Sequence, residues 1–217
     1  MQRPFRVAAL AEGSVGVKQK LTLACPIIPT IDTWLDDVVK PAALLYFGVP
    51  VVDLNAGSYS CRGRNNRRGA KLSEHSFGNA IDVMSFVLAD GRVITVKGGW
   101  RGNPVEQDFL REVFVGACER FNTVLGPGSD AYHNDHLHLD LARHDPRGMR
   151  KFCKPVLKFE KRLDPMLVSE LKAQGGQYAS QPQQQTGSPQ QGAYSSYATG
   201  NETAAPYAAD ILPNEEE

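Results

Sequence analysis

The stretch Ala131-Tyr-His-Asn-Asp-His-Leu-His-Leu-Asp-Leu-Ala142 decides the fold. From His136 onward polar and apolar residues alternate, which predicts a β-strand with one polar and one apolar face. The apolar face carries the leucines Leu137, Leu139 and Leu141. The polar face carries His136, His138 and Asp140. Because the leucines need a core to pack on, we expect the histidines to lie on the opposite face of a sheet.

The clustering of histidines indicates a metal site. Imidazoles two residues apart on one strand face lie roughly 6–7 Å apart and can bind one metal ion. His133 and Asp135 come just before them, and four of the five histidines lie either here or in Ser73-Glu-His-Ser-Phe-Gly-Asn-Ala-Ile-Asp82. The structural alternatives are a hydrogen-bonded core histidine at 75 and a surface pair at 136 and 138.

The second stretch would add two ligands to the first. His75 and Asp82 are seven positions apart, and the small residues Gly78 and Ala80 between them would let a tight turn bring both side chains together. Two neutral imidazoles and one carboxylate make a three-ligand zinc site that leaves a fourth position for water.

The length and net charge of the chain argue against several other classes of protein, such as nucleic-acid-binding and membrane-spanning proteins. A chain of 217 residues with no net charge fits one well-cored domain and gives no support for binding nucleic acid. It contains no apolar run long enough for a membrane span, and it leaves the oligomeric state open. The apolar part that follows Arg3 and Arg6 is too short for an intact signal peptide.

Four widely spaced cysteines give an indication of the cellular compartment in which the protein works. They are Cys25, Cys61, Cys118 and Cys153, and none forms a Cys-x-x-Cys pair. Their even number favours two disulfides and an oxidising compartment, either the periplasm or outside the cell. The alternative is buried free thiols in a cytoplasmic protein.

Hydrophobic periodicity predicts the order of the elements. A helix capped by Thr30 or Asp32 runs to Phe47, kinks or breaks at Pro41 and stops at Gly48. Strands follow at 49–54, 80–88 and 92–96, then a helix from Pro104, then strands at 122–125 and 136–141. This order predicts an α+β domain with a small antiparallel sheet flanked by helices.

Composition sets the expected boundaries. We expect residues 1–24 to form a lead-in, 25–160 the domain, and 161–217 a disordered tail rich in Gln, Ser, Pro, Gly and Ala. Within the domain, Arg62-Gly-Arg-Asn-Asn-Arg-Arg-Gly69 is expected to be an exposed loop. Its four arginines either face an anionic ligand or are simply solvated.

Two motifs resemble those of known zinc enzymes. The pattern Ser73-x-His75-x-x-Gly78-x-Ala80-x-Asp82 resembles the signature of zinc D-Ala-D-Ala carboxypeptidases and dipeptidases. The pattern His133-x-x-His136-x-His138 resembles an element of penicillin-insensitive murein endopeptidase, which shares the lysostaphin and hedgehog fold. Together with Leu125-Gly-Pro-Gly128, they are most similar to the bacterial extensin-like protein C-terminal family over roughly residues 20–155.

The resemblance implies a role for each site residue. It implies that the zinc ligands are His75, Asp82 and His138. It implies that His136 lies beside the metal and that His133 faces the substrate or supports the ligands.

It also implies a base and a substrate-binding cation. The carboxypeptidases carry a glutamate three residues before the last ligand, where this chain has the shorter Asp135, so the base is Asp135, His136 or both. Arg62 would lie on a strand ahead of the first ligand, where those enzymes carry a substrate-binding arginine.

These features together predict a zinc-dependent peptidase that hydrolyses amide bonds in peptidoglycan stem peptides or crosslinks. Whether it is a D,D-endopeptidase or a carboxypeptidase stays open. The alternative is a non-catalytic, zinc-containing module that binds the cell wall.

Overall fold

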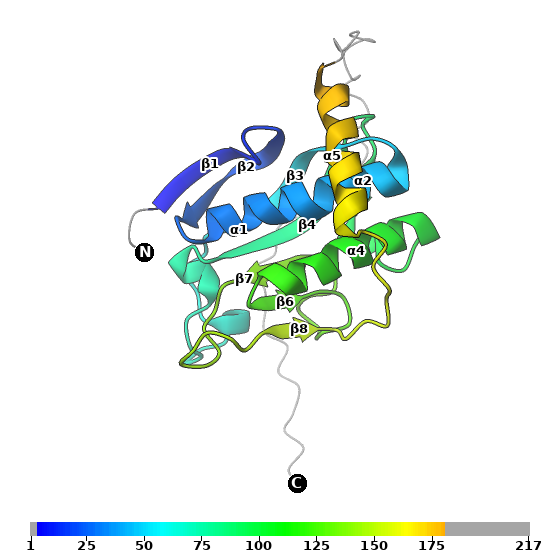
Figure 1. The fold of residues 1–217 in the computed structure, drawn as a ribbon. Helices are drawn as coiled ribbons and strands as arrows, with labels where there is room; N and C mark the ends of the chain where they lie inside the picture. Colours follow the sequence, from blue (N-terminus) through cyan, green and yellow to red (C-terminus); the bar gives the residue numbers. More distant parts are fainter. Residues whose placement is uncertain (1–3, 181–217) are drawn as a thin grey trace, which may run out of the picture. The chain divides into compact units, whose positions relative to one another are not determined.

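A mixed eight-stranded sheet forms the framework of residues 4–180, the part of the chain that the computed structural model describes (Figure 1). Its strands are β1 (Pro4–Leu10), β2 (Val15–Ala24), β3 (Val51–Gly57), β4 (Ala80–Leu88), β5 (Val93–Thr95), β6 (Thr123–Leu125), β7 (Leu137–Asp140) and β8 (Phe152–Lys154). Their order across the sheet is β1-β2-β3-β4-β7-β6-β8, with β5 paired to β4. The predicted α+β class is therefore confirmed.

The sheet is larger than we expected and is not purely antiparallel. The pairs β2–β3 and β6–β8 are parallel, whereas the others are antiparallel. A parallel pair needs a crossover connection, and the helical segment between β2 and β3 supplies one. The predicted hairpin of β4 and β5 is present, with Gly91 in its turn at a φ of 85°.

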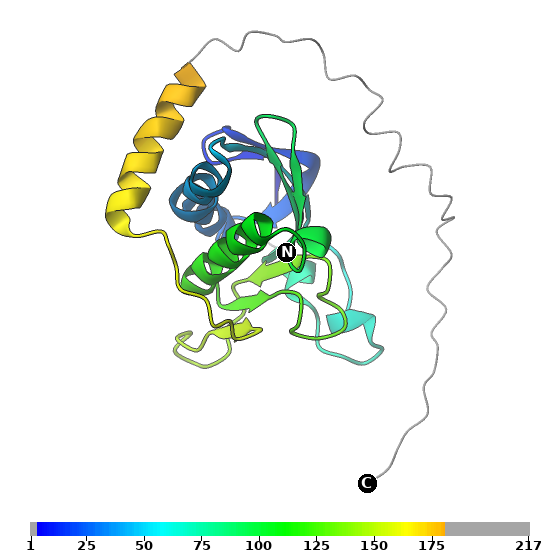
Figure 2. The ribbon, with the colours of Figure 1, turned by 90° about the vertical axis from the view of Figure 1, so that its right-hand side faces the viewer.

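Helices cover one face of this sheet (Figures 1 and 2). They are α1 (Ile27–Trp34), the π-helix η1 (Leu35–Val39), α2 (Lys40–Phe47) and α4 (Pro104–Arg120). The short α3 (Val96–Gly99) follows β5, and α5 (Pro165–Ser180) packs on α2 instead of on the sheet. Two 3₁₀ turns, η2 (Arg64–Asn66) and η3 (Glu74–Phe77), lie in the long connection between β3 and β4. No helix within residues 4–180 combines the length and the hydropathy needed to cross a membrane.

The core lies between these helices and the sheet. Leu137 and Leu139 of β7 are fully buried in it, as the alternating pattern predicts. The expected apolar side of α4 is buried as well, namely Phe109, Leu110, Val113, Phe114, Ala117 and the following Phe121. The indole nitrogen of Trp34 donates to the Val113 carbonyl at 3.0 Å, which fixes α1 against α4. Asp140 and His138 therefore occupy the opposite face of β7.

The helix around Pro41 differs in detail from the prediction. It begins at Ile27, without a side-chain cap from Thr30 or Asp32, and it ends before Gly48, which has a φ of 74°. Pro41 is accommodated because the preceding turn widens into η1, where the Lys40 N–H bonds to the Leu35 carbonyl. Asp32 instead accepts a hydrogen bond from the Ala11 N–H at 2.8 Å.

Residues 4–24 are not a lead-in but part of the sheet. The strands β1 and β2 pair with each other, and β2 also pairs with β3. Their buried residues join the main core, and these include Leu10, Val15, Leu21 and Leu23. Periodicity was weak there because β1 lies at the edge of the sheet and most of its residues are exposed.

The expected tail from residue 161 also begins too early. The Arg162 and Leu163 amides bond to the Glu112 carboxylate, and α5 follows with Leu171 buried. Most residues from 158 to 164 are charged, and backbone amides make part of the contact, so hydrophobic periodicity did not reveal this docking. Residues 181–217 lie outside the part that the structure describes.

One of the two expected disulfides is present. Cys118 of α4 is bonded to Cys153 of β8 across 35 positions, which closes the edge of the sheet against the helix layer. Cys25 and Cys61 are free and exposed, so the expectation of a second bridge is wrong for this structure. Cys25 lies in the turn before α1, and Cys61 lies in the connection beyond β3.

Candidate metal centre

Strand pairing and one tight turn bring the three predicted ligands together. Asp82 of β4 lies directly opposite His138 of β7 in the antiparallel register, so both project from the same face. His75 comes from η3, where the Ser73 side chain accepts the His75 N–H. The turn ends at Gly78, whose φ of 66° favours glycine and returns the chain into β4. The seven positions from His75 to Asp82 are thus occupied by the rest of a 3₁₀ turn and the first residues of β4.

The side chains of His75, Asp82 and His138 converge at close range. The Nε2 atom of His75 lies 3.1 Å from Nδ1 of His138 and 3.0 Å from the Asp82 carboxylate. Nδ1 of His138 lies 2.8 Å from Asp82 Oδ1. Among the described residues, these three form the group whose ligand atoms all lie within 4.8 Å of one another. His75 is 2% exposed and His138 8% exposed, so water screens the cluster little.

Hydrogen bonds on the far side of each ring fix which nitrogen faces the cluster. Nδ1 of His75 lies 2.5 Å from the Ser58 carbonyl, which can only accept, so this nitrogen carries the proton. Nε2 of His138 lies 2.9 Å from Asp140 Oδ2, so the same argument places its proton there. In the neutral rings, the inward nitrogens of His75 and His138 are therefore both acceptors.

This donor set fits a cation. Two imidazole lone pairs and the carboxylate of Asp82 face one another with no donor between them. Such an arrangement is unfavourable until a positive ion enters, and nitrogen, nitrogen and carboxylate oxygen are ligands that zinc prefers. The bonds to Ser58 and Asp140 are of the kind that orient ligating histidines in known zinc sites.

The close contacts within the cluster also shift the pKa values of His138 and Asp82. Burial opposes a charged ring at His138, but hydrogen bonds with Asp140 and Asp82 outweigh it and raise the His138 pKa to about 9. Burial likewise opposes a charged Asp82, yet hydrogen bonds with His138 and His75 hold its pKa well below the usual range. When no metal is bound, a proton on His138 thus supplies the positive charge that the cluster needs.

His136 lies beside the three converging side chains and is more exposed than His75. Its Nε2 atom is 3.6 Å from Asp82 Oδ1, and its Nδ1 atom is 2.8 Å from Asp135 Oδ1. The Asp135 side chain is 59% exposed and does not contact the ligands, so it reaches the centre only through His136. The two candidate bases therefore form one hydrogen-bonded pair.

His133 forms a second pair, with Asp130. Its Nδ1 atom is 2.7 Å from Asp130 Oδ1, and its ring centroid lies 5.2 Å from that of His136 and 5.6 Å from that of His138. Burial lowers the His133 pKa, and the charge of Asp130 offsets only part of that effect. His133 thus lines the centre without being one of the three converging ligands.

Arg62 does not lie on a strand, contrary to the expectation, because β3 ends at Gly57. Its backbone is nevertheless fixed to the turn that carries His75: the Arg62 N–H donates to Ser76 Oγ, and the Arg62 carbonyl accepts from the Ser73 N–H. The other arginines of this loop, Arg64, Arg67 and Arg68, are exposed as predicted.

Several residues that support the site were missed by sequence reasoning. Asp140 was placed on the polar face of β7 but given no role, and Ser58, Asp130 and Thr123 were not singled out. Asp140 alone had a usable signal, since a carboxylate two residues after a ligand on the same strand face can reach its ring.

Comparison with protein families gives a match over residues 1–154, to the family described as "Extensin-like protein C-terminus". The chain belongs to this family. Comparison with curated proteins and with solved structures found no match. The family match spans β1 to β8 and contains His75, Asp82 and His138, and it extends the expected range of residues 20–155 to the first residue of the chain.

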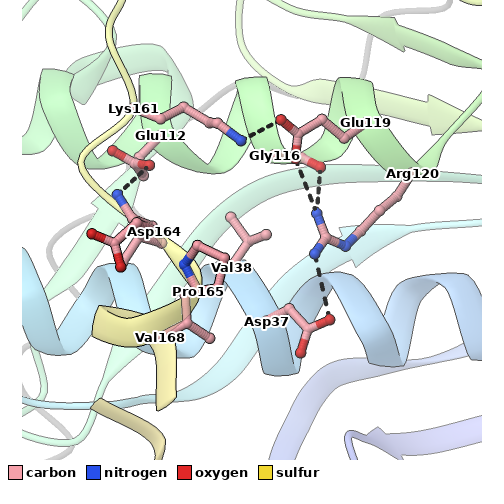
Figure 3. Close-up of a pocket in the computed structure, with 11 residues that line it drawn as sticks. Asp37, Val38, Glu112, Gly116, Glu119, Arg120, Lys161, Asp164, Pro165 and Val168 are labelled. Atoms are coloured by element: carbon pink, nitrogen blue, oxygen red, sulfur yellow. Dashed lines mark hydrogen bonds and ion pairs between the residues drawn. The ribbon is translucent and has the colours of Figure 1, made fainter. Parts of the chain in front are cut away.

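A separate pocket lies between η1, α4 and the segment that leads into α5, and this last segment lies beyond the family region (Figure 3). It has a volume of about 310 Å³. Its lining residues are Asp37, Val38, Glu112, Gly116, Glu119, Arg120, Lys161, Leu163, Asp164, Pro165 and Val168. None of the converging histidines lines it, so this pocket and the candidate metal centre are different places.

Proposed function

We propose that this member of the extensin-like C-terminal family is a zinc-dependent peptidase that hydrolyses amide bonds in peptidoglycan stem peptides or crosslinks. The observation that carries the proposal is the convergence of the inward nitrogens of His75 and His138 on Asp82, with no donor among them. His75 Nε2, His138 Nδ1 and the Asp82 carboxylate would hold the ion. Zinc bound there would supply a Lewis acid that polarises an amide carbonyl and lowers the pKa of water to about 7.

The residues beside the ligands can move a proton. The Nε2 atom of His136 faces Asp82, whereas its Nδ1 atom is hydrogen-bonded to Asp135. A carboxylate that fixes one imidazole nitrogen leaves the other free to accept a proton and then to return it to a leaving amine. His136 is thus the proposed general base and acid, and Asp135 orients it.

Charge around the centre supports an anionic peptide substrate. Arg62 is fixed against the turn that carries His75, and exposed arginines continue along the same loop. Peptide stems with free carboxylates suit such a surface, since guanidinium groups bind carboxylates in a bidentate manner. The disulfide between Cys118 and Cys153 supports action in an oxidising compartment, the periplasm or the cell exterior.

One observation favours a second function, a non-catalytic wall-binding module that keeps zinc as a structural element. His136 Nε2 lies only 3.6 Å from Asp82 Oδ1, so a small rotation would bring it to the metal as a fourth protein ligand. Four protein ligands are typical of structural zinc sites, whereas three with an open position are typical of catalytic ones.

Digestion of purified muropeptides distinguishes the two functions. The zinc-loaded protein is expected to release new peptide products, identified by mass, and a chelator should abolish them until zinc is restored. The masses also separate an endopeptidase, which splits crosslinks, from a carboxypeptidase, which removes a terminal residue. Stoichiometric zinc with no cleavage of any muropeptide would overturn the peptidase and favour the wall-binding module.

A further inference from the structure

Behind the metal centre, a row of hydrogen bonds leads from His138 to the surface of the domain. Asp140 holds Nε2 of His138 at 2.9 Å. Thr123 of β6 lies directly opposite Asp140 in the β6–β7 pair, and its side chain hydrogen-bonds the Asp140 carboxylate. Oγ1 of Thr123 in turn lies 2.8 Å from Nε2 of His144, the fifth histidine of the chain. The row joins four side chains from β6, β7 and the segment that follows β7.

The direction of each hydrogen bond follows from the chemistry of the groups. A carboxylate only accepts, so both His138 Nε2–H and the Thr123 hydroxyl donate to Asp140. Since the hydroxyl has a single hydrogen, its oxygen is left to accept from His144 Nε2–H. The Ala142 N–H donates to the other oxygen of Asp140 at 2.9 Å. Asp140 thus accepts from His138, Thr123 and Ala142, and these donors fix the position of its carboxylate.

We propose that Thr123 and His144 are positioning residues of the metal centre, which act through Asp140 to keep the His138 ring oriented with Nδ1 toward the ion. The inference rests on the proposed zinc site and adds to it two residues that touch neither the ligand atoms nor a substrate. Outer contacts of this kind typically change metal affinity by about 10–100-fold when they are removed.

The hydroxyl of Thr123 has no comparable role in the strand itself. Thr123 is 7% exposed at the start of β6, where valine would fill nearly the same volume and favour a strand equally well. His144 is half-buried in a segment without regular structure, and its ring also lies 6.1 Å from that of Phe152. What valine cannot reproduce is the bridge between Asp140 and His144.

Zinc affinity of matched threonine variants tests the first half of the inference. The dissociation constant is measured by competition with a chromophoric chelator on the full-length protein, next to the melting temperature of the metal-free form. Thr123→Val is expected to weaken zinc binding by about 10–100-fold, whereas Thr123→Ser, which keeps the hydroxyl, binds as the parent does. Thr33→Val is the matched control, because it removes a hydroxyl that bonds only to the Pro29 carbonyl of its own helix.

A double-mutant cycle tests the second half. His144→Ala is expected to weaken zinc binding in the parent but not further in the Thr123→Val background, because the effect passes through the same hydroxyl. His144→Gln, whose amide N–H can still donate, should restore part of the affinity. A melting temperature that stays near that of the parent in the metal-free variants separates this role from general loss of structure.

The outcomes separate the inference from the function on which it rests. If the parent binds no zinc at micromolar concentration, the zinc site is overturned and the inference falls with it. If the parent binds zinc and Thr123→Val binds it equally well, the zinc site stands and the inference alone is overturned. Additive losses in the cycle would overturn the role of His144 and leave that of Thr123.

Discussion

Two regions of this domain gather ionisable side chains, and they differ in how those groups are paired. In the pocket between η1 and α4, each carboxylate has donors. Asp37 bonds to Arg120 at 3.4 Å and Lys172 at 2.5 Å, and Glu119 bonds to Lys161. Glu112, which is 1% exposed, accepts from the Tyr46 hydroxyl and from two backbone amides. These groups satisfy one another and hold the segment before α5 against α4.

The metal centre has the opposite balance. Its inward-facing atoms are acceptors, and the donors of His75 and His138 are used on the outside, at Ser58 and Asp140. Clustering of ionisable side chains alone therefore does not indicate a ligand site. A set of buried acceptors that must take up a metal ion or a proton does, because acceptors that face one another without positive charge destabilise the fold.

The largest effect is expected for a ligand of the metal centre. His138→Ala removes one of three proposed ligands, so zinc affinity should fall by more than the roughly 100-fold typical of outer contacts, and muropeptide cleavage should be lost with it. Metal analysis of the purified protein and chelator competition measure this. A variant that retained stoichiometric zinc would show that the ligand set is wrong.

The next largest effect is expected for two substitutions that should lower the cleavage rate without releasing the metal. His136→Ala removes the proposed base, so the cleavage rate should fall by about 10²–10⁴ while zinc stays bound. Asp135→Asn keeps the size of the side chain but not its charge, so it should give a smaller loss of the same kind. Zinc content and cleavage are measured together on both proteins. Loss of zinc from His136→Ala would instead make His136 a ligand and favour the wall-binding module.

A substitution in the pocket should lower the stability of the domain and leave its metal affinity unchanged. Glu112→Gln leaves one oxygen for donors that now use two, namely the Arg162 amide at Oε2 and the Leu163 amide at Oε1. The free energy of unfolding is expected to fall by about 1–3 kcal/mol, as measured by urea denaturation of the metal-free protein. Zinc affinity should equal that of the parent. A weakened zinc site would mean that the two regions are coupled, and the comparison between them would fail.

The remaining effect is a pH dependence confined to the metal centre. The His138 pKa is raised to about 9 from 6.5, so its protonation stabilises the metal-free fold fully below about pH 6.5, and this contribution is lost as pH rises through about 9. Asp82 has a lowered pKa, so its contribution is present above its ordinary value of 3.8 and is lost as pH falls.

Unfolding of the chelated protein between pH 6 and 9.5 tests this dependence. Stability should decline with pH in the parent and stay flatter in His138→Gln, which cannot be protonated in this range. An equal decline in both proteins would place its origin outside the centre.

Much of the fold could be predicted because local pattern decided it. The alternation after His136, the apolar side of α4 and the hairpin at Gly91 depend on neighbours in sequence, and the structure contains each of them. The strands β1 and β2 and the docking of residues 162–163 could not be predicted, because an exposed edge strand and backbone-to-carboxylate bonds leave little periodic signal.

The candidate site shows the same division. The convergence of His75, Asp82 and His138 could be predicted from spacing and family resemblance, since His75 to Asp82 spans one turn and the entry to β4. Its supporting contacts depend on register. Thr123 faces Asp140 because β6 pairs with β7. The spacing of residues within one strand does not show how that strand pairs with another. The placement of Arg62 was wrong because β3 stops at Gly57 and a long connection follows.

The wide sequence separation of the ligands has a kinetic consequence. Asp82 and His138 are 56 positions apart, and His75 and His138 are 63 apart. Contacts between distant parts of a chain form late in folding, so the ligands meet only when β7 docks beside β4. Metal capture would then follow assembly of the sheet instead of nucleating it. Zinc would lengthen the lifetime of the folded domain by slowing its unfolding, while the rate of refolding stays that of the bare chain.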